Sequence, residues 1–156
     1  MLRIIISSII LLSTTLYIYM SDDDLSGTHW RCNNLKTSFL SEAFQRYQSL
    51  SEEMTYTFTS DSSFNIREFI TVTDKNGDID KAEATYYGEY KIYDNKLKLI
   101  IEKARLLKSH KDKTINNDYH EYDGIEIEYA IYLTKRNLYF YSPAKSEIFN
   151  MICKKI

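Results

Sequence analysis

The chain has 156 residues and a formal net charge of −2 at pH 7. This length suits one domain with its own hydrophobic core and leaves no comfortable room for a second. The slightly acidic balance argues against nucleic acid as a partner, because phosphate binding needs a net positive face.

The chain begins with an apolar segment. Residues 1–21 carry one positive charge, at Arg3, and the next charged side chain is Asp22. Such a stretch is typical of exported proteins and is about as long as a single membrane span. We expect a signal peptide or an uncleaved inner-membrane anchor here rather than a buried core helix. Residues 22–156 are then periplasmic or secreted, because the positive end stays in the cytoplasm.

A strand and then a helix are expected next. In "GTHWRCN", from Gly27 to Asn33, Trp30 and Cys32 share one face of a strand. The segment Ser38–Met54 instead has apolar residues at helical spacing. These residues are Leu40, Ala43, Phe44, Tyr47 and Leu50. We predict an amphipathic helix whose apolar stripe packs on the fold.

Strands follow, because the period of the pattern falls to two. Apolar and polar side chains alternate in Met54–Thr59, Phe64–Val72 and Lys81–Tyr93, and again from Leu97 toward Leu107. Tight turns are expected at Asn76-Gly77 and Asp94-Asn95, since such pairs favour hairpins.

The first of these turns also carries part of a calcium-binding pattern. Asp74, Asn76 and Asp78 match the first, third and fifth ligand positions of an EF-hand loop. The sixth position, which needs Gly, holds Ile79, and the twelfth, which needs Glu, holds Thr85. The pattern therefore favours a hairpin corner, and we predict no metal site.

The segment from Lys108 to Gly124 is polar and aperiodic, so we expect a long connection. Its side chains His110, Asp112, Asp118, His120, Glu121 and Asp123 are of the types that bind divalent cations. Their spacing does not make them converge, which favours a solvated loop. Strands are expected beyond it at Ile125–Leu133, Leu138–Phe140 and Glu147–Lys155.

The chain has two cysteines, Cys32 and Cys153, near the two ends of its exported part. In an oxidising compartment such a pair predicts one disulfide. The alternative, a metal ligand or catalytic thiol, has little support because neither cysteine has a CxxC partner.

The pattern predicts a mainly β fold of eight strands. Short turns make neighbouring strands antiparallel, and one apolar face per strand requires the sheet to close or to pack on a second sheet. Closure would place the first and last strands side by side, so that Cys32 can reach Cys153. We therefore predict an eight-stranded antiparallel up-and-down barrel, with one α-helix between the first two strands, rather than a sandwich.

Two motifs resemble lipocalins. Gly27-Thr28-His29-Trp30 resembles their opening Gly-x-Trp, and "YYGEYKIYDNKLKLI", Tyr86–Ile100, is similar to their Gly-x-Tyr strand, turn and Leu-x-Leu return. The expected helix is similar in placement to the lid of fatty-acid-binding proteins. The chain thus resembles a bacterial lipocalin-like, calycin-type domain. This resemblance implies a closed barrel around an apolar ligand, without catalysis.

Tyrosine is abundant, with 14 residues in the chain. A tyrosine-lined interior can hydrogen-bond the polar end of a ligand while its rings cover the apolar body. The predicted ligand-binding residues are Phe44, Tyr56, Phe58, Tyr86, Tyr90 and Tyr129. The same rings could instead fill the core, since an eight-stranded barrel is just wide enough for either arrangement.

The sequence contains no HExxH motif, phosphate loop or nucleophile elbow. We therefore expect a non-enzymatic protein that binds a small apolar or amphipathic ligand without a cofactor. The alternative is a periplasmic protein-binding module, such as an inhibitor or immunity protein. It would use the outward tyrosines Tyr87, Tyr93, Tyr132, Tyr139 and Tyr141 and the acidic loops Asp74–Asp80 and Asp118–Asp123.

Overall fold

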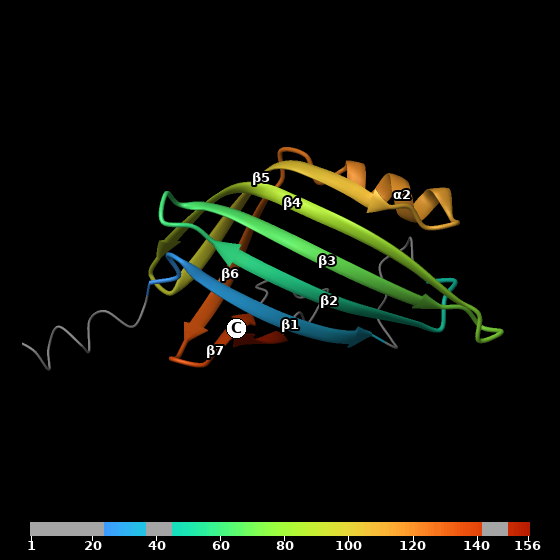
Figure 1. The fold of residues 1–156 in the computed structure, drawn as a ribbon, viewed down its shortest axis with the longest axis horizontal. Coiled ribbons are helices and arrows are strands. Elements are labelled where there is room, and N and C mark those ends of the chain that lie inside the picture. Colours follow the sequence, from blue (N-terminus) through green and yellow to red (C-terminus); the bar gives the residue numbers. More distant parts are fainter. Residues whose placement is uncertain (1–23, 37–44, 142–149) are drawn as a thin grey trace, which may run out of the picture.

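The computed structural model describes residues 24–36, 45–141 and 150–156. These residues form one curled sheet and one helix (Figure 1). The strands are β1 (Thr28–Lys36), β2 (Ser49–Phe58), β3 (Ser63–Thr73), β4 (Ile79–Tyr93), β5 (Lys96–Lys108), β6 (Glu126–Leu133), β7 (Asn137–Tyr141) and β8 (Asn150–Lys155). The helix, α2 (Lys113–His120), lies between β5 and β6.

The sheet closes on itself. Each strand pairs antiparallel with the one before it, and β8 pairs with β1. At this seam Trp30 lies opposite Lys155 and Cys32 lies opposite Cys153. The predicted eight-stranded up-and-down barrel is therefore confirmed over the described residues. The sandwich is excluded.

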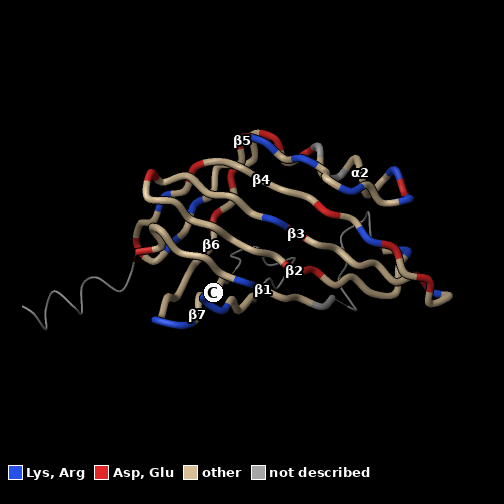
Figure 2. Tube along the Cα trace, in the orientation of Figure 1, with Lys and Arg blue, Asp and Glu red and all other residues tan. Residues whose placement is uncertain are grey.

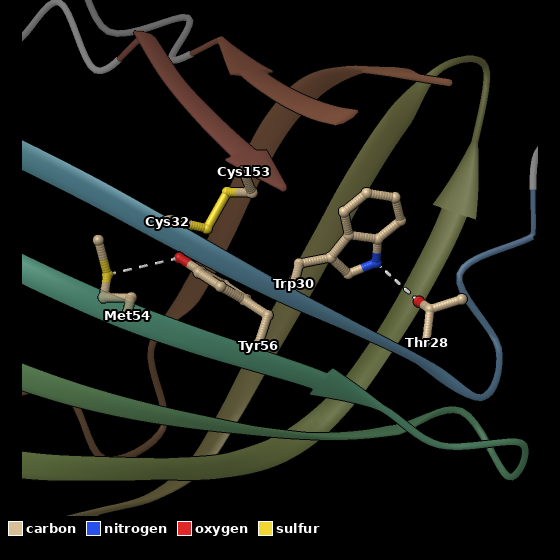
Figure 3. Close-up of a disulfide and its surroundings, with 6 residues drawn as sticks. All are labelled: Thr28, Trp30, Cys32, Met54, Tyr56 and Cys153. Carbon is tan, nitrogen blue, oxygen red and sulfur yellow. Dashed lines mark hydrogen bonds between the residues drawn. A yellow bond between two sulfur atoms is a disulfide. The ribbon is translucent and has the colours of Figure 1, made fainter. Parts of the chain in front are cut away.

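A disulfide joins Cys32 and Cys153 across the seam, as predicted (Figure 3). The two Cα atoms are 4.2 Å apart, and both side chains are fully buried. The bond connects positions separated by 121 residues. It therefore ties the first strand of the sheet to the last from within the core.

Alternation along each strand separates a buried inner face from a polar outer face. Trp30, Phe58 and Phe140 are the largest fully buried side chains. The Trp30 Nε1–H donates a hydrogen bond to Thr28 Oγ1 at 2.7 Å, so the polar edge of the indole is satisfied inside the barrel. Acidic and basic residues are interspersed along the described strands (Figure 2).

Both predicted hairpin turns are confirmed. Between β3 and β4, Gly77 has a φ of 89°, and the Asp74 carboxylate accepts hydrogen bonds from the backbone N–H groups of Asn76 and Asp78. This carboxylate therefore holds the corner together locally. Between β4 and β5, Asp94 and Asn95 both have positive φ (49° and 58°), as a two-residue turn of this hand requires.

The predicted helix over Ser38–Met54 is wrong in its second half. Residues 37–44, including Phe44, lie outside the described residues, but the chain is a strand from Ser49 onward. Leu50 pairs with Lys36 on one side and Val72 on the other. Pairing along both edges therefore overrides the local helical spacing.

The segment Lys108–Gly124 is not a loop throughout, because it contains the helix α2. Asp112 provides its start: the Asp112 carboxylate accepts a hydrogen bond from the N–H of Thr114 at 2.9 Å, which is the geometry of an N-cap. Ile115 and Tyr119, four positions apart, form the buried side of the helix.

The predicted export segment, residues 1–21, lies outside the described residues. Among the helices of the described part, none has the length and apolar character needed to cross a bilayer.

Replacing both Cys32 and Cys153 by Ala should lower the free energy of unfolding by about 4–5 kcal/mol, because the disulfide restricts the unfolded chain across a long loop. Urea unfolding followed by Trp30 fluorescence measures this loss. A reducing agent should produce a similar loss in the unmodified protein and none in the double variant. Equal stability of the oxidised and reduced proteins would contradict the structural role of the bond.

Gly88 lies at an irregularity in the pairing of β4 with β5. The register between these strands shifts at Tyr87/Gly88. A Cβ atom at position 88 would overlap the carbonyl oxygen of Ile100, far inside van der Waals contact. The neighbouring backbone cannot yield as a flexible side chain would, so only glycine fits this irregularity.

Gly88→Ala should therefore destabilise the protein by about 1–3 kcal/mol, the usual cost of overpacking. The matched control is Glu89→Ala at the next, exposed position, which should change stability by less than about 0.5 kcal/mol. Chemical unfolding of both variants provides the comparison, and equal midpoints would show that the backbone at Gly88 has more room than the structure indicates.

Candidate functional site

Five of the six predicted ligand-binding residues face into the barrel. Tyr56, Phe58, Tyr86 and Tyr90 are buried, and Tyr129 is half-buried. The sixth, Phe44, lies outside the described residues. The alternation of each strand was therefore a sufficient signal for which aromatic side chains point inward.

The inward rings form two groups. In the first, the ring centroids of Phe58 and Tyr90 are 4.9 Å apart, and Phe140 lies 5.2 Å from Tyr56 and 5.3 Å from Tyr129. Phe140 connects rings from β2 and β6, and it was not among the predicted site residues. Its parity with Leu138 on a predicted strand was the signal that could have identified it.

The second group lies around Tyr86 and includes residues that the sequence did not assign to the interior. Tyr119 of α2 and Tyr122, just beyond it, have ring centroids 6.5 Å and 5.6 Å from that of Tyr86. Tyr119 is buried and Tyr122 is half-buried. The supposed solvated connection thus places two aromatic rings against the barrel core.

A carboxylate, Glu68, is buried beside Tyr86. Glu68 is 7% exposed and lies on the inner face of β3 between Ile66 and Ile70. The Tyr86 hydroxyl donates a hydrogen bond to Glu68 Oε2 at 2.6 Å. Burial, and then the Glu68 charge, raise the pKa of Tyr86, so its hydroxyl stays protonated and remains a donor. Glu68 was missed, although it shares the inward parity of its strand.

A second acidic side chain, Glu52, turns inward on β2. Its Oε2 atom is buried. Burial raises the pKa of Tyr56, and the charges of Tyr129, Glu68 and Glu52 add to the effect. The Tyr56 hydroxyl donates to Met54 Sδ at 3.8 Å (Figure 3). Glu68 therefore lies within electrostatic reach of the hydroxyls of both Tyr56 and Tyr86, and Glu52 lies within reach of the Tyr56 hydroxyl.

Small side chains adjoin this polar group. Ala84 pairs with Glu68, and Ala104 pairs with Tyr86. Both alanines are buried. On β6 the inward residues Ile127, Tyr129, Ile131 and Leu133 pack against the core but are only half-buried. Small side chains thus lie beside Glu68 on β4 and beside Tyr86 on β5, and the inner face of β6 keeps accessible surface.

His110 anchors the start of the α2 segment at one end of the barrel. Its side chain is fully buried (0% exposed), and its Nε2 atom is 3.3 Å from Asp80 Oδ2 without hydrogen-bond alignment. Its Nδ1 atom accepts a hydrogen bond from the N–H of Asp112 at 3.0 Å. Asn116 brackets the same residue, accepting from the His110 N–H and donating to its carbonyl.

The acidic and histidine side chains between Lys108 and Gly124 do not assemble into a metal site within the described residues. No group of three or more His, Cys, Asp or Glu side chains there could hold a metal ion. Asp112 instead contacts Arg46 and Tyr47, and Asp123 contacts Lys103. The side chains of Asp118 and His120 lie outside the description.

The predicted outward tyrosines do face solvent. Tyr87, Tyr93, Tyr132 and Tyr141 are exposed, and Tyr139 is half-buried. Tyr132 and Tyr139 are paired across β6 and β7, with ring centroids 5.9 Å apart, and Tyr139 pairs with the exposed Ile152 of β8. Two tyrosine rings and the Ile152 side chain therefore form a row across the outer face of β6, β7 and β8, called here the exposed aromatic row.

No protein-family model matches the sequence, and a comparison with curated proteins found no match. The fold thus defines the class: a closed, eight-stranded antiparallel up-and-down β-barrel with a disulfide across its seam. This barrel is consistent with the predicted lipocalin-like fold, while membership of that family stays a prediction.

The buried His110 should make stability depend on pH. Burial lowers the pKa of His110, with Lys111 and Arg46 acting in the same direction and Asp80 opposing them. The unfolded chain therefore takes up a proton before the folded one does, so stability present above about pH 6.5 should be lost as the pH falls below it. A proton on Nδ1 would also displace the Asp112 N–H bond.

Urea unfolding of the unmodified protein between about pH 7 and pH 5 tests this expectation. In this window His110→Gln should remove most of the decline, whereas His29→Gln, at an exposed position, should keep it. Asp80 does not account for the decline in this pH window. Backbone hydrogen bonds, chiefly from Lys111, lower the pKa of Asp80, so its contribution to stability is lost only at more acidic pH. Identical slopes for all three proteins would contradict the role of His110.

Proposed function

We propose that this chain is a non-enzymatic, lipocalin-like protein that binds a small apolar or amphipathic ligand inside its barrel. The observation that carries the proposal is the chemical mixture on the inner face: aromatic rings together with tyrosine hydroxyls and the buried Glu68 carboxylate. A core that served stability alone would favour apolar side chains here, because burying a charge is costly.

The half-buried inner face of β6 supports a route to the interior. Tyr129 and Ile131 pack against the core and still keep accessible surface. Tyr129 lies close to the aromatic group around Phe140, so a ligand that touches it would also meet this group. Sites for small molecules combine such an apolar lining with a few convergent polar groups.

We also propose export of the folded domain, residues 22–156. The disulfide supports an oxidising compartment, because cytosolic thiols are usually kept reduced. The protein is periplasmic or secreted if residues 1–21 are removed, and it is held at the inner membrane if they are retained.

The exposed aromatic row on β6, β7 and β8 favours a second candidate, a protein-binding module such as an inhibitor or immunity protein. Tyr132 and Ile152 are more than half exposed, at 62% and 57%. Tyrosine is enriched in the cores of protein interfaces. The acidic hairpin contributes less than expected, since the Asp74 and Asp80 carboxylates already accept backbone hydrogen bonds.

Titration with a neutral apolar dye such as Nile red tests the barrel as a binding site. We expect saturable binding that Tyr129→Ala weakens by about fivefold, equivalent to about 1 kcal/mol. Tyr132→Ala is the matched control on the outer face of the same strand and should leave the affinity unchanged. Absence of saturable binding would contradict the proposal. Loss of binding only in Tyr132→Ala would assign the dye to the outer aromatic row.

A further inference from the structure

The inner face of the barrel has a definite electrostatic sign. The buried residues of the described part include the acidic residue Glu68 but no Lys or Arg. Glu52 adds a buried carboxylate oxygen from β2, and both glutamates act on the Tyr56 hydroxyl. On β8, Lys155 has the same parity as the inward-facing residues, but it is exposed. Its Nζ atom lies 5.7 Å from the centroid of the Trp30 ring.

Aromatic rings reinforce this sign. The ring faces of tyrosine carry negative potential and attract cations. The Tyr86 hydroxyl donates a hydrogen bond to Glu68, and the rings of Tyr119 and Tyr122 lie against the Tyr86 ring. Besides burial, Tyr129 and Glu68 both act to raise the pKa of Tyr56, so the Tyr56 hydroxyl lies within electrostatic reach of each. Glu68 thus lies beside the ring group of Tyr86, and its charge also reaches the Tyr56 hydroxyl of the other ring group.

Small side chains lie on one side of this pair. On β4 Ala84 lies opposite Glu68 and on β5 Ala104 lies opposite Tyr86, whereas Met54 and Ile66 lie opposite them on the other side. A ligand head group on the alanine side of Glu68 would therefore meet a methyl group and rings. Its apolar body would extend toward Phe58 and Phe140, which are fully buried.

We propose that the ligand is an organic cation: a protonated amine with an apolar body, whose ammonium group lies against Glu68 among Tyr56, Tyr86 and Tyr129. This inference rests on the proposed ligand-binding function and names the chemical class of the ligand. An ammonium group donates charge-assisted hydrogen bonds to a carboxylate and is attracted by ring faces. A fatty acid would instead bring a second negative charge toward Glu68 and be repelled.

Calorimetric titration with three ligands that share a decyl chain but differ in the charge of the head group tests which charge the interior prefers. We expect decylamine to bind at least about tenfold more tightly than decanol, and decanoate to bind most weakly. Glu68→Gln keeps the shape of the side chain and its ability to accept from Tyr86. It should abolish the preference for decylamine over decanol, so the measured quantity is the ratio of the two affinities. Glu89→Gln, an exposed position on β4, should behave like the unmodified protein.

The outcomes separate this inference from the function on which it rests. If decanol or decanoate binds the unmodified protein as tightly as decylamine, the cation assignment is overturned and the barrel remains a binding site. A preference for the amine that survives Glu68→Gln would overturn the assignment of the ammonium group to Glu68. If none of the three ligands binds, the ligand-binding function itself is rejected for amphipathic molecules, independently of charge.

Discussion

Pairing of β8 with β1 is the constraint on which the rest of the structure depends. An open sheet with these sequences would expose two edges and leave the apolar face of every strand uncovered. The disulfide between Cys32 and Cys153 lies in this pairing, and it joins residues that are opposite each other in register. Closure therefore removes the edges and, in the same step, creates an interior.

Once the interior exists, the parity of each strand decides its chemistry. Glu68 is buried because its neighbours Ile66 and Ile70 must face inward, and a one-residue shift would turn all three outward. The Tyr86 hydroxyl partly compensates for the cost of that burial. The polar group inside the barrel is thus a property of the sequence alternation and of closure acting together, and it is the basis of the proposed preference for cationic ligands.

Much of the architecture could be predicted from the sequence, because its signals are local. Alternation located the strands, Asn76-Gly77 and Asp94-Asn95 marked two turns, and the two cysteines indicated which strands meet. The errors arose at two places: where strand pairing overrode the local pattern, and where a helix was too short to give a clear pattern. Residues from Ser49 to Met54 have helical spacing but are held as strand by β1 and β3. The helix α2 is too short and polar to show a clear period, and its cap at Asp112 was its main signal.

The seam between β1 and β8 can be tested most directly by amide hydrogen exchange with NMR contacts across it. Closure predicts slow exchange in both strands and cross-strand contacts between Arg31 and Lys154 and between Cys32 and Cys153. Rapid exchange along β1 and β8, with no contacts between them, would show that the sheet is open. The interior proposed as a binding site would then not exist.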